Sequence, residues 1–152
     1  MRLDWYKALP KGLEAMLGLQ KVVDESKIDH KLLELVKIRA SQINGCGHCL
    51  DMHTKDAIAL GESEQRLHVL AAWKEAPFYS ERERAALDWC ESLTNISNTG
   101  APDEVYKEVE RLFSPEEIVE LTMSIVVING WNRLAVGFRS EVGNYVSNRS
   151  TK

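Results

Sequence analysis

The 152-residue chain lacks the features that mark several classes of protein. It has 19 basic against 23 acidic residues and no Lys/Arg cluster longer than two, so it offers no basic surface for nucleic acid or an anionic membrane. No apolar run reaches the ~18 residues of a membrane span. The N-terminus also lacks the apolar core of a secretory signal, so we expect a cytoplasmic protein.

Signals for β-strands are nearly absent as well. No segment alternates apolar and polar residues, and no Asn-Gly turn joins two apolar runs. Helical periodicity is present throughout, and we find no internal repeat or long linker. We therefore predict one all-α domain over residues 1–152. The expected helices cover about 11–24, 29–43, 46–60, 63–76, 80–96, 102–113 and 114–138.

The last of these segments is apolar on nearly all sides. Ser114 is the expected N-cap, and Pro115 takes the first helical position. Glu120, Asn129 and Arg133 interrupt the apolar residues, which argues against a membrane span. A helix of this kind in so small a chain predicts a central buried helix or a subunit interface, and hence an oligomer.

The segment "GCGHCLDMH", residues 45–53, holds two of the three cysteines and two of the four histidines. In a helix that starts near Cys46, the side chains of Cys46, Cys49 and His53 share one face. A helix N-terminus stabilises a thiolate, and His53 lies one turn from Cys49, where it can take up a proton. His48 lies off this face.

A carboxylate can be assigned to the same site from the turn at residues 44–45. If the flanking helices form an antiparallel hairpin, Glu34 faces His53 and can fix its tautomer. The competing interpretation is a solvent-exposed stripe of residues at helical spacing, and the pattern alone favours it. The other members of that stripe are Lys31, Lys37 and Ser41.

Zinc is the main alternative for the two cysteines, because Cys46, Cys49, His53 and one further ligand could form a tetrahedral site. One helix seldom supplies three ligands of a closed site, and no second Cys or His pair follows. In a reducing compartment a redox or catalytic pair is therefore favoured over a metal site, and over a chance grouping.

The remaining reactive or polar residues receive structural interpretations. Cys90 lies among apolar residues and is expected to be a packed cysteine. His30 and His68 are typical of cap or surface histidines. Asn132 and Arg133 within the last helix are expected to hold helices or subunits together through hydrogen bonds or ion pairs.

The full spacing is Glu34, eleven residues, Cys46-Gly47-His48-Cys49, three residues and His53. This pattern resembles the alkylhydroperoxidase AhpD-like group of the carboxymuconolactone decarboxylase-like family, with a match at every position. The segments "FYSERERAALDWCESLT" and "NGWNRLAVGF" also look like later helices of that family. The resemblance extends from about residue 30 to residue 140.

The resemblance implies an all-helical homo-trimer or homo-hexamer with a helix hairpin that carries the CxxC. It implies a peroxidase that acts on hydroperoxides, with Cys49 as the peroxidatic and Cys46 as the resolving cysteine. Glu34 and His53 would form the proton relay, assisted by His48. A dithiol, such as a lipoylated protein, would reduce the disulfide, and no cofactor or metal would be needed. The alternatives are a non-redox decarboxylase that uses Glu34 and His53, and a metal-binding or structural oligomer.

Overall fold

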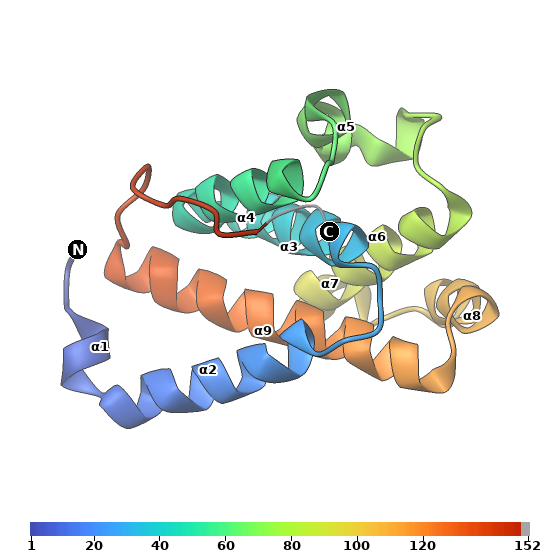
Figure 1. The fold of residues 1–152 in the computed structure, drawn as a ribbon. Coiled ribbons are helices and arrows are strands. Elements are labelled where there is room, and N and C mark those ends of the chain that lie inside the picture. Colours follow the sequence, from blue (N-terminus) through green and yellow to red (C-terminus); the bar gives the residue numbers. More distant parts are fainter. Residues whose placement is uncertain (150–152) are drawn as a thin grey trace.

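The computed structural model describes residues 1–149, which form helices and connecting segments without a β-strand (Figure 1). The all-helical prediction is confirmed for this part of the chain. Its elements are α1 (Trp5–Ala8), α2 (Pro10–Asp24), α3 (His30–Asn44), α4 (Gly47–Ala59), α5 (Glu64–Val69), the 3-10 helix η1 (Leu70–Glu75), α6 (Glu81–Thr94), α7 (Ile96–Thr99), α8 (Asp103–Leu112) and α9 (Pro115–Phe138).

Two of the helix starts are fixed by the capping boxes that the sequence suggests. Ser80 caps α6 by accepting the backbone N–H of Glu83, and the Glu83 carboxylate accepts the N–H of Ser80 in return. Ser114 and Glu117 make the same reciprocal bonds at the start of α9. Each box satisfies backbone donors that a helix N-terminus leaves unpaired, so both boundaries are set locally.

Helix α3 lies at the centre of the molecule and packs against α4, α6 and α9. Its apolar residues Leu33 and Val36 are fully buried in the main core. Glu34, Lys37 and Ser41 are also buried, with at most 3% of their surface exposed. The interpretation of these three residues as a solvent-exposed stripe is therefore wrong, because three helices cover α3 and its own periodicity does not decide which side meets water.

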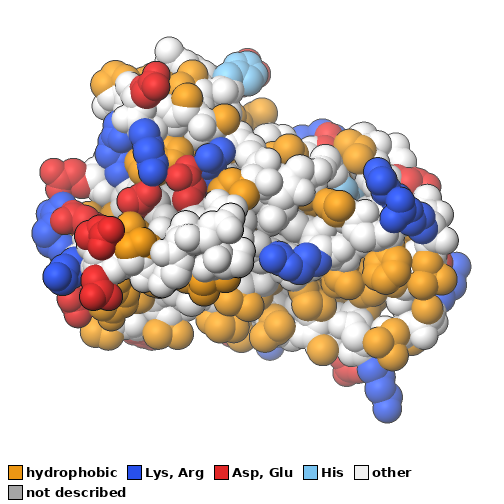
Figure 2. Space-filling model, turned by 180° about the vertical axis from the view of Figure 1, so that it is seen from behind, with side chains coloured by type: hydrophobic (Ala, Val, Ile, Leu, Met, Phe, Trp, Pro, Cys, Tyr) orange, Lys and Arg blue, Asp and Glu red, His pale blue; other side chains and the backbone are white. Residues whose placement is uncertain are grey.

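The apolar surface of the molecule is concentrated on α2 and α9. Helix α9 packs on α2, α3 and α6, yet Val119 and Val126 on its outer side are 61% and 51% exposed. Leu17 and Val22 of α2 are about equally exposed. Figure 2 shows hydrophobic side chains gathered along the lower edge of the molecule, the edge at which Figure 1 places α2 and α9.

Among residues 1–149, no helix combines the length and apolar character that crossing a bilayer requires.

Residues 140–149, here called the C-terminal strap, follow α9 and run back beside α4 (Figure 1). The backbone N–H of Gly143 donates to the Asp51 carboxylate at 3.2 Å. The Lys55 ammonium donates to the carbonyl oxygen of Tyr145 at 2.9 Å. The strap is thus attached to the helix that carries the CxxC.

Candidate active site

The hairpin of α3 and α4 brings the two cysteines to the start of α4. Gly45 ends α3 with φ +65°, a left-handed conformation that glycine adopts without steric cost. Cys46 is the N-cap of α4, and its sulfur accepts the backbone N–H of Cys49 at 3.3 Å. A position at the start of a helix would place Cys46 nearer to solvent than Cys49, but both cysteines are only 1% exposed. The cause is that Cys46 packs into the core cluster to which α9 contributes.

The pKa values of the two thiols are shifted in opposite directions. The hydrogen bond from the Cys49 thiol lowers the pKa of Cys46 to about 6, with help from the Cys49 backbone N–H and the charge of His48. The same hydrogen bond, together with burial, raises the pKa of Cys49 well above its usual range. These opposite shifts favour a thiolate on Cys46 over one on Cys49, and the helix dipole at the N-cap acts in the same direction.

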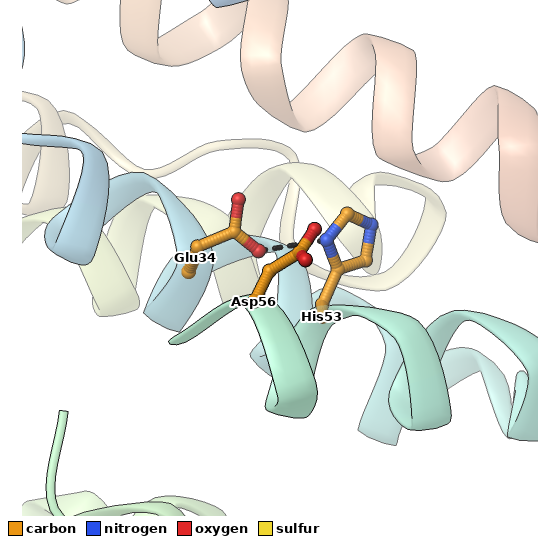
Figure 3. A group of neighbouring side chains, drawn as sticks. All are labelled: Glu34, His53 and Asp56. Carbon is orange, nitrogen blue, oxygen red and sulfur yellow. Dashed lines mark hydrogen bonds and ion pairs between the residues drawn. The ribbon is translucent and has the colours of Figure 1, made fainter. Parts of the chain in front are cut away.

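Glu34 and His53 meet across the hairpin, as the turn predicts. The Nδ1–H of His53 donates to Oε2 of Glu34 at 2.7 Å, and both side chains are buried (Figure 3). The ammonium of Lys37 donates to Oε1 of the same carboxylate at 2.9 Å. Burial alone would raise the pKa of Glu34, but His53 and Lys37 outweigh it and lower this pKa to about 2. Glu34 is therefore ionised throughout the neutral range, and the bond fixes the His53 tautomer so that Nε2 is unprotonated when the ring is neutral.

Asp56 is a site residue that the sequence analysis missed. It lies one turn beyond His53 on α4 and is buried, and Figure 3 shows its carboxylate beside the Glu34–His53 pair. One ligand-type atom each from Glu34, His53 and Asp56 lies within 4.8 Å of the others. Lys37 already supplies a cation to this group, so the donor set does not fit a metal ion while the Lys37–Glu34 bond is intact. Lys37 is three residues after Glu34, and Asp56 is three residues after His53. This spacing places each beside its partner on the helix and could have identified both as site residues.

A cavity of about 370 Å³ opens beside this group. Cys49, His53, Lys37 and Asp56 are among the residues that line it. Its apolar lining residues include Trp5, Leu13, Leu17, Trp131 and Leu134, and its other polar ones include Gln20, Asp24, Asn148 and Arg149. This volume and lining are typical of a site for a small organic molecule.

Cys46 faces a different and smaller cavity of about 150 Å³. His48 lines both cavities, and its Nδ1–H donates to the carbonyl oxygen of Glu141 in the strap at 2.6 Å. Access and charge are therefore divided between the cysteines. Cys49 faces the large cavity, whereas Cys46 holds the thiolate.

Structural interpretations from the sequence are confirmed for Asn132 and Cys90, but not for Arg133, which is exposed and bonds to Asn129 of its own helix. Asn132 is buried and ties α9 to α3, because its amide donates to Ser41 Oγ at 3.0 Å and accepts from the Asn44 amide at 2.9 Å. Cys90 is fully buried, and burial raises its pKa to about 12, as expected for an unreactive packed cysteine.

Comparison with known proteins identifies the family. The carboxymuconolactone decarboxylase family model matches residues 10–92. The uncharacterized protein YdfG of Bacillus subtilis (strain 168) is 43% identical over 135 residues, which cover 89% of this chain and 92% of YdfG.

Solved structures give a consistent result. ATU0492 of Agrobacterium tumefaciens superposes on this chain with a TM-score of 0.91 and 44% sequence identity. The match covers 95% of this chain and 99% of ATU0492. ATU0492 is a protein of unknown function for which an AhpD antioxidant defence role has been suggested. The debrominase Bmp8 has a TM-score of 0.81 at 23% identity, covers 91% of this chain and 74% of its own, and shows the fold alone. From the family match over more than half its length and the close relatives, the chain belongs to the carboxymuconolactone decarboxylase family.

Proposed function

We propose that the protein is a cysteine-based hydroperoxidase that cycles between a dithiol and a disulfide at Cys46 and Cys49. The observation that carries the proposal is that Cys49 and His53 line one cavity, and that His53 is bonded to the buried carboxylate of Glu34. A thiol, a histidine oriented by a carboxylate and room for an organic substrate are the parts that this chemistry needs. The suggested AhpD role of ATU0492 supports the same assignment.

The proposed reaction starts with one proton on the thiol pair and one extra proton on His53. Cys49 passes its proton to the Cys46 thiolate and attacks the outer peroxide oxygen. The O–O bond breaks, the alkoxide takes the proton from His53 and leaves as an alcohol, and Cys49 becomes a sulfenic acid. The Cys46 thiol then attacks the Cys49 sulfur, the S–O bond breaks, and the thiol proton leaves with hydroxide as water.

The resulting disulfide needs a dithiol reductant, and a lipoyl group on a partner protein is a suitable chemical class. The substrate is proposed to be a hydroperoxide with an apolar substituent, because Trp131 and Leu134 line the cavity that Cys49 faces. His48, which lines both cavities, is proposed to assist at the Cys46 thiolate through its charge.

Counting thiols tests the proposal. Reduced protein is treated with one equivalent of cumene hydroperoxide under nitrogen, denatured and titrated for free thiols. We expect three thiols before treatment and one after it, with three again after addition of dihydrolipoamide. The Cys90→Ser variant is the matched control, and it should go from two thiols to none.

Other results would favour other functions. Retention of all three thiols under these conditions would contradict the peroxidase and favour a non-redox enzyme, such as a decarboxylase that uses Glu34 and His53 as acid and base. About one bound zinc per chain, with unfolding on chelation, would favour the metal-binding alternative.

The exposed apolar side chains on α2 and α9 are proposed to pack against further copies of the chain in a homo-trimer or homo-hexamer. Val119, Val126, Leu17 and Val22 would lose water contact in such an assembly, which is the favourable term in association. Light scattering at micromolar concentration should give three or six times the chain mass of 17.2 kDa. A mass equal to that of one chain would contradict the assembly.

A further inference from the structure

The buried charges around His53 do not balance when its ring is neutral. Lys37 neutralises Glu34, because its ammonium lies 2.9 Å from one carboxylate oxygen while His53 binds the other. Asp56 adds a second negative charge within 4.8 Å of both His53 and Glu34. Buried charges are stable only when they are paired, so this group is balanced when His53 carries a proton.

From this arrangement we propose that Asp56 is a positioning residue for the peroxidase reaction, which supplies the negative charge that keeps His53 protonated and able to protonate the leaving alkoxide. The inference rests on the proposed function, in which His53 donates that proton. Glu34 retains the role of orienting the ring through its 2.7 Å bond. Asp56 acts on the charge of the ring and not on its orientation, because no hydrogen bond to His53 is needed for this effect.

The other charged groups near His53 do not cancel the charge of Asp56. Arg149 of the strap pairs with Asp24 of α2, with 3.6 Å between the charged atoms, so these two residues offset each other. The negative charge of the thiol pair favours a protonated ring in the same way as Asp56 does. The remaining titratable groups that line the cavity with His53 are Lys37, His48, Tyr6 and Tyr145.

The C-terminal strap holds the Asp56 carboxylate in place. The Tyr145 hydroxyl donates to Oδ1 at 2.9 Å, and the Ser147 hydroxyl donates to the same oxygen at 2.5 Å. Burial, followed by the bond to Asp56, raises the pKa of Tyr145 to about 12, so its phenol remains a donor across the working pH range. Tyr145, which is 89 positions from Asp56 in the sequence, thereby helps to hold the Asp56 carboxylate in place.

Imidazole NMR on the Asp56→Asn variant tests the inference directly. An amide removes the charge but keeps an oxygen that can accept the Tyr145 and Ser147 hydroxyl groups. We expect the His53 ring signals to change from imidazolium to neutral imidazole at a lower pH than in the wild type, because a negative charge beside the ring has been removed. The Nδ1–H bond to Glu34 should persist as a downfield proton signal. Unchanged ring signals in Asp56→Asn would overturn the inference.

Kinetics provides the second readout. At pH 7.5 the rate of cumene hydroperoxide reduction by Asp56→Asn should fall by about tenfold, and the deficit should shrink toward pH 6 as the ring regains its proton. A loss that is the same at every pH would indicate a merely structural role and contradict the inference. Tyr145→Phe, which removes one of the two bonds to Asp56, should show a smaller change of the same kind.

Asp51→Asn is the matched control. Asp51 lies on the same helix and also binds the strap, through Gly143, but it pairs with Lys55 and does not belong to the cluster around His53. This variant should keep the wild-type ring signals and pH profile. If wild-type protein loses no thiols to hydroperoxide, the proposed function fails while the NMR experiment still decides the charge effect of Asp56.

Discussion

Two of the buried or half-buried charge groups among residues 1–149 have similar components and different surroundings. One is the cluster of Glu34, Lys37, His53 and Asp56 between α3 and α4. The other is centred on Arg66 of α5, which bridges the carboxylates of Glu62 and Glu83. Both contain two carboxylates and one permanently basic side chain, so charge content alone does not distinguish them.

The partners of each group do distinguish them. The two carboxylates that bind Arg66 also accept backbone N–H groups at helix starts, from Ser63 and from Ser80. The guanidinium further donates to the Phe78 carbonyl oxygen. These bonds hold α5 and the start of α6 together. The cluster of α3 and α4 instead includes a titratable imidazole that lines a cavity beside a thiol. Access to a cavity, and not the number of ion pairs, marks the group that can carry out chemistry.

The largest effect on peroxidase activity is expected from substitution of the cysteines beside the cluster of α3 and α4. Cys49→Ser should abolish the reaction with hydroperoxide, because Cys49 faces the large cavity and a hydroxyl is a far weaker nucleophile. Cys46→Ser should react once and leave Cys49 as a sulfenic acid that dimedone traps. Mass spectrometry after one equivalent of hydroperoxide locates the label. A label on Cys46 in the Cys49→Ser protein, with none on Cys49 in the reciprocal variant, would reverse the assignment and show that thiolate charge outweighs access.

Removal of the orienting carboxylate should have the next largest effect. Glu34→Gln leaves His53 without its charged partner, so the peroxidase rate at neutral pH should fall by about 10²–10⁴-fold. It also leaves Lys37 buried and unpaired, at a cost of about 3 kcal/mol in the free energy of unfolding. The double variant Glu34→Gln/Lys37→Met should regain that stability but not the rate. If Glu34→Gln keeps the wild-type rate, the relay role of Glu34 is wrong.

Lowering the pH should reduce the contribution of Glu34 to the free energy of unfolding, and this effect is smaller than those of the substitutions above. The pKa of Glu34 is about 2 in the folded protein and 4.5 without its partners. Its contribution is therefore complete above pH ~5 and is lost as the pH falls toward 2, a change of about 3 kcal/mol. Urea unfolding between pH 6 and pH 3 should show about 2 kcal/mol of this loss, because the folded-state pKa lies below the end of that range. The Glu34→Gln/Lys37→Met variant should lose less stability over this range, and an identical pH dependence would contradict the assignment to Glu34.

The Arg66 group should show the smallest effect on catalysis. Arg66→Met removes the bridge between Glu62 and Glu83, and because these side chains are only partly exposed we expect a loss of about 2 kcal/mol. Thermal unfolding should shift by about 5 °C. The peroxidase rate per folded molecule should stay at the wild-type value. A large fall in that rate would show that the two groups are coupled and would remove the distinction between them.

The features that depend on near neighbours in the chain could be predicted from the sequence. The capping serines Ser80 and Ser114, the turn at Gly45 and the spacing of Cys46 and Cys49 are local, so their consequences follow from helix geometry. The juxtaposition of Glu34 and His53 could also be predicted, because a short turn between two helices fixes which residues face each other.

Which polar residues are buried, and how their charges combine, depends on packing between elements that are distant in the sequence. Lys37 is buried because α3 is covered by α4, α6 and α9, and helical periodicity contains no information about that cover. The bond from Tyr145 to Asp56 joins residues 89 positions apart, and it forms because the C-terminal strap runs back along α4. The position of the thiolate depends on which sulfur accepts the hydrogen bond within the buried pair. Burial and charge balance are properties of all the elements packed around a site, and for this reason they emerge only when the chain is folded.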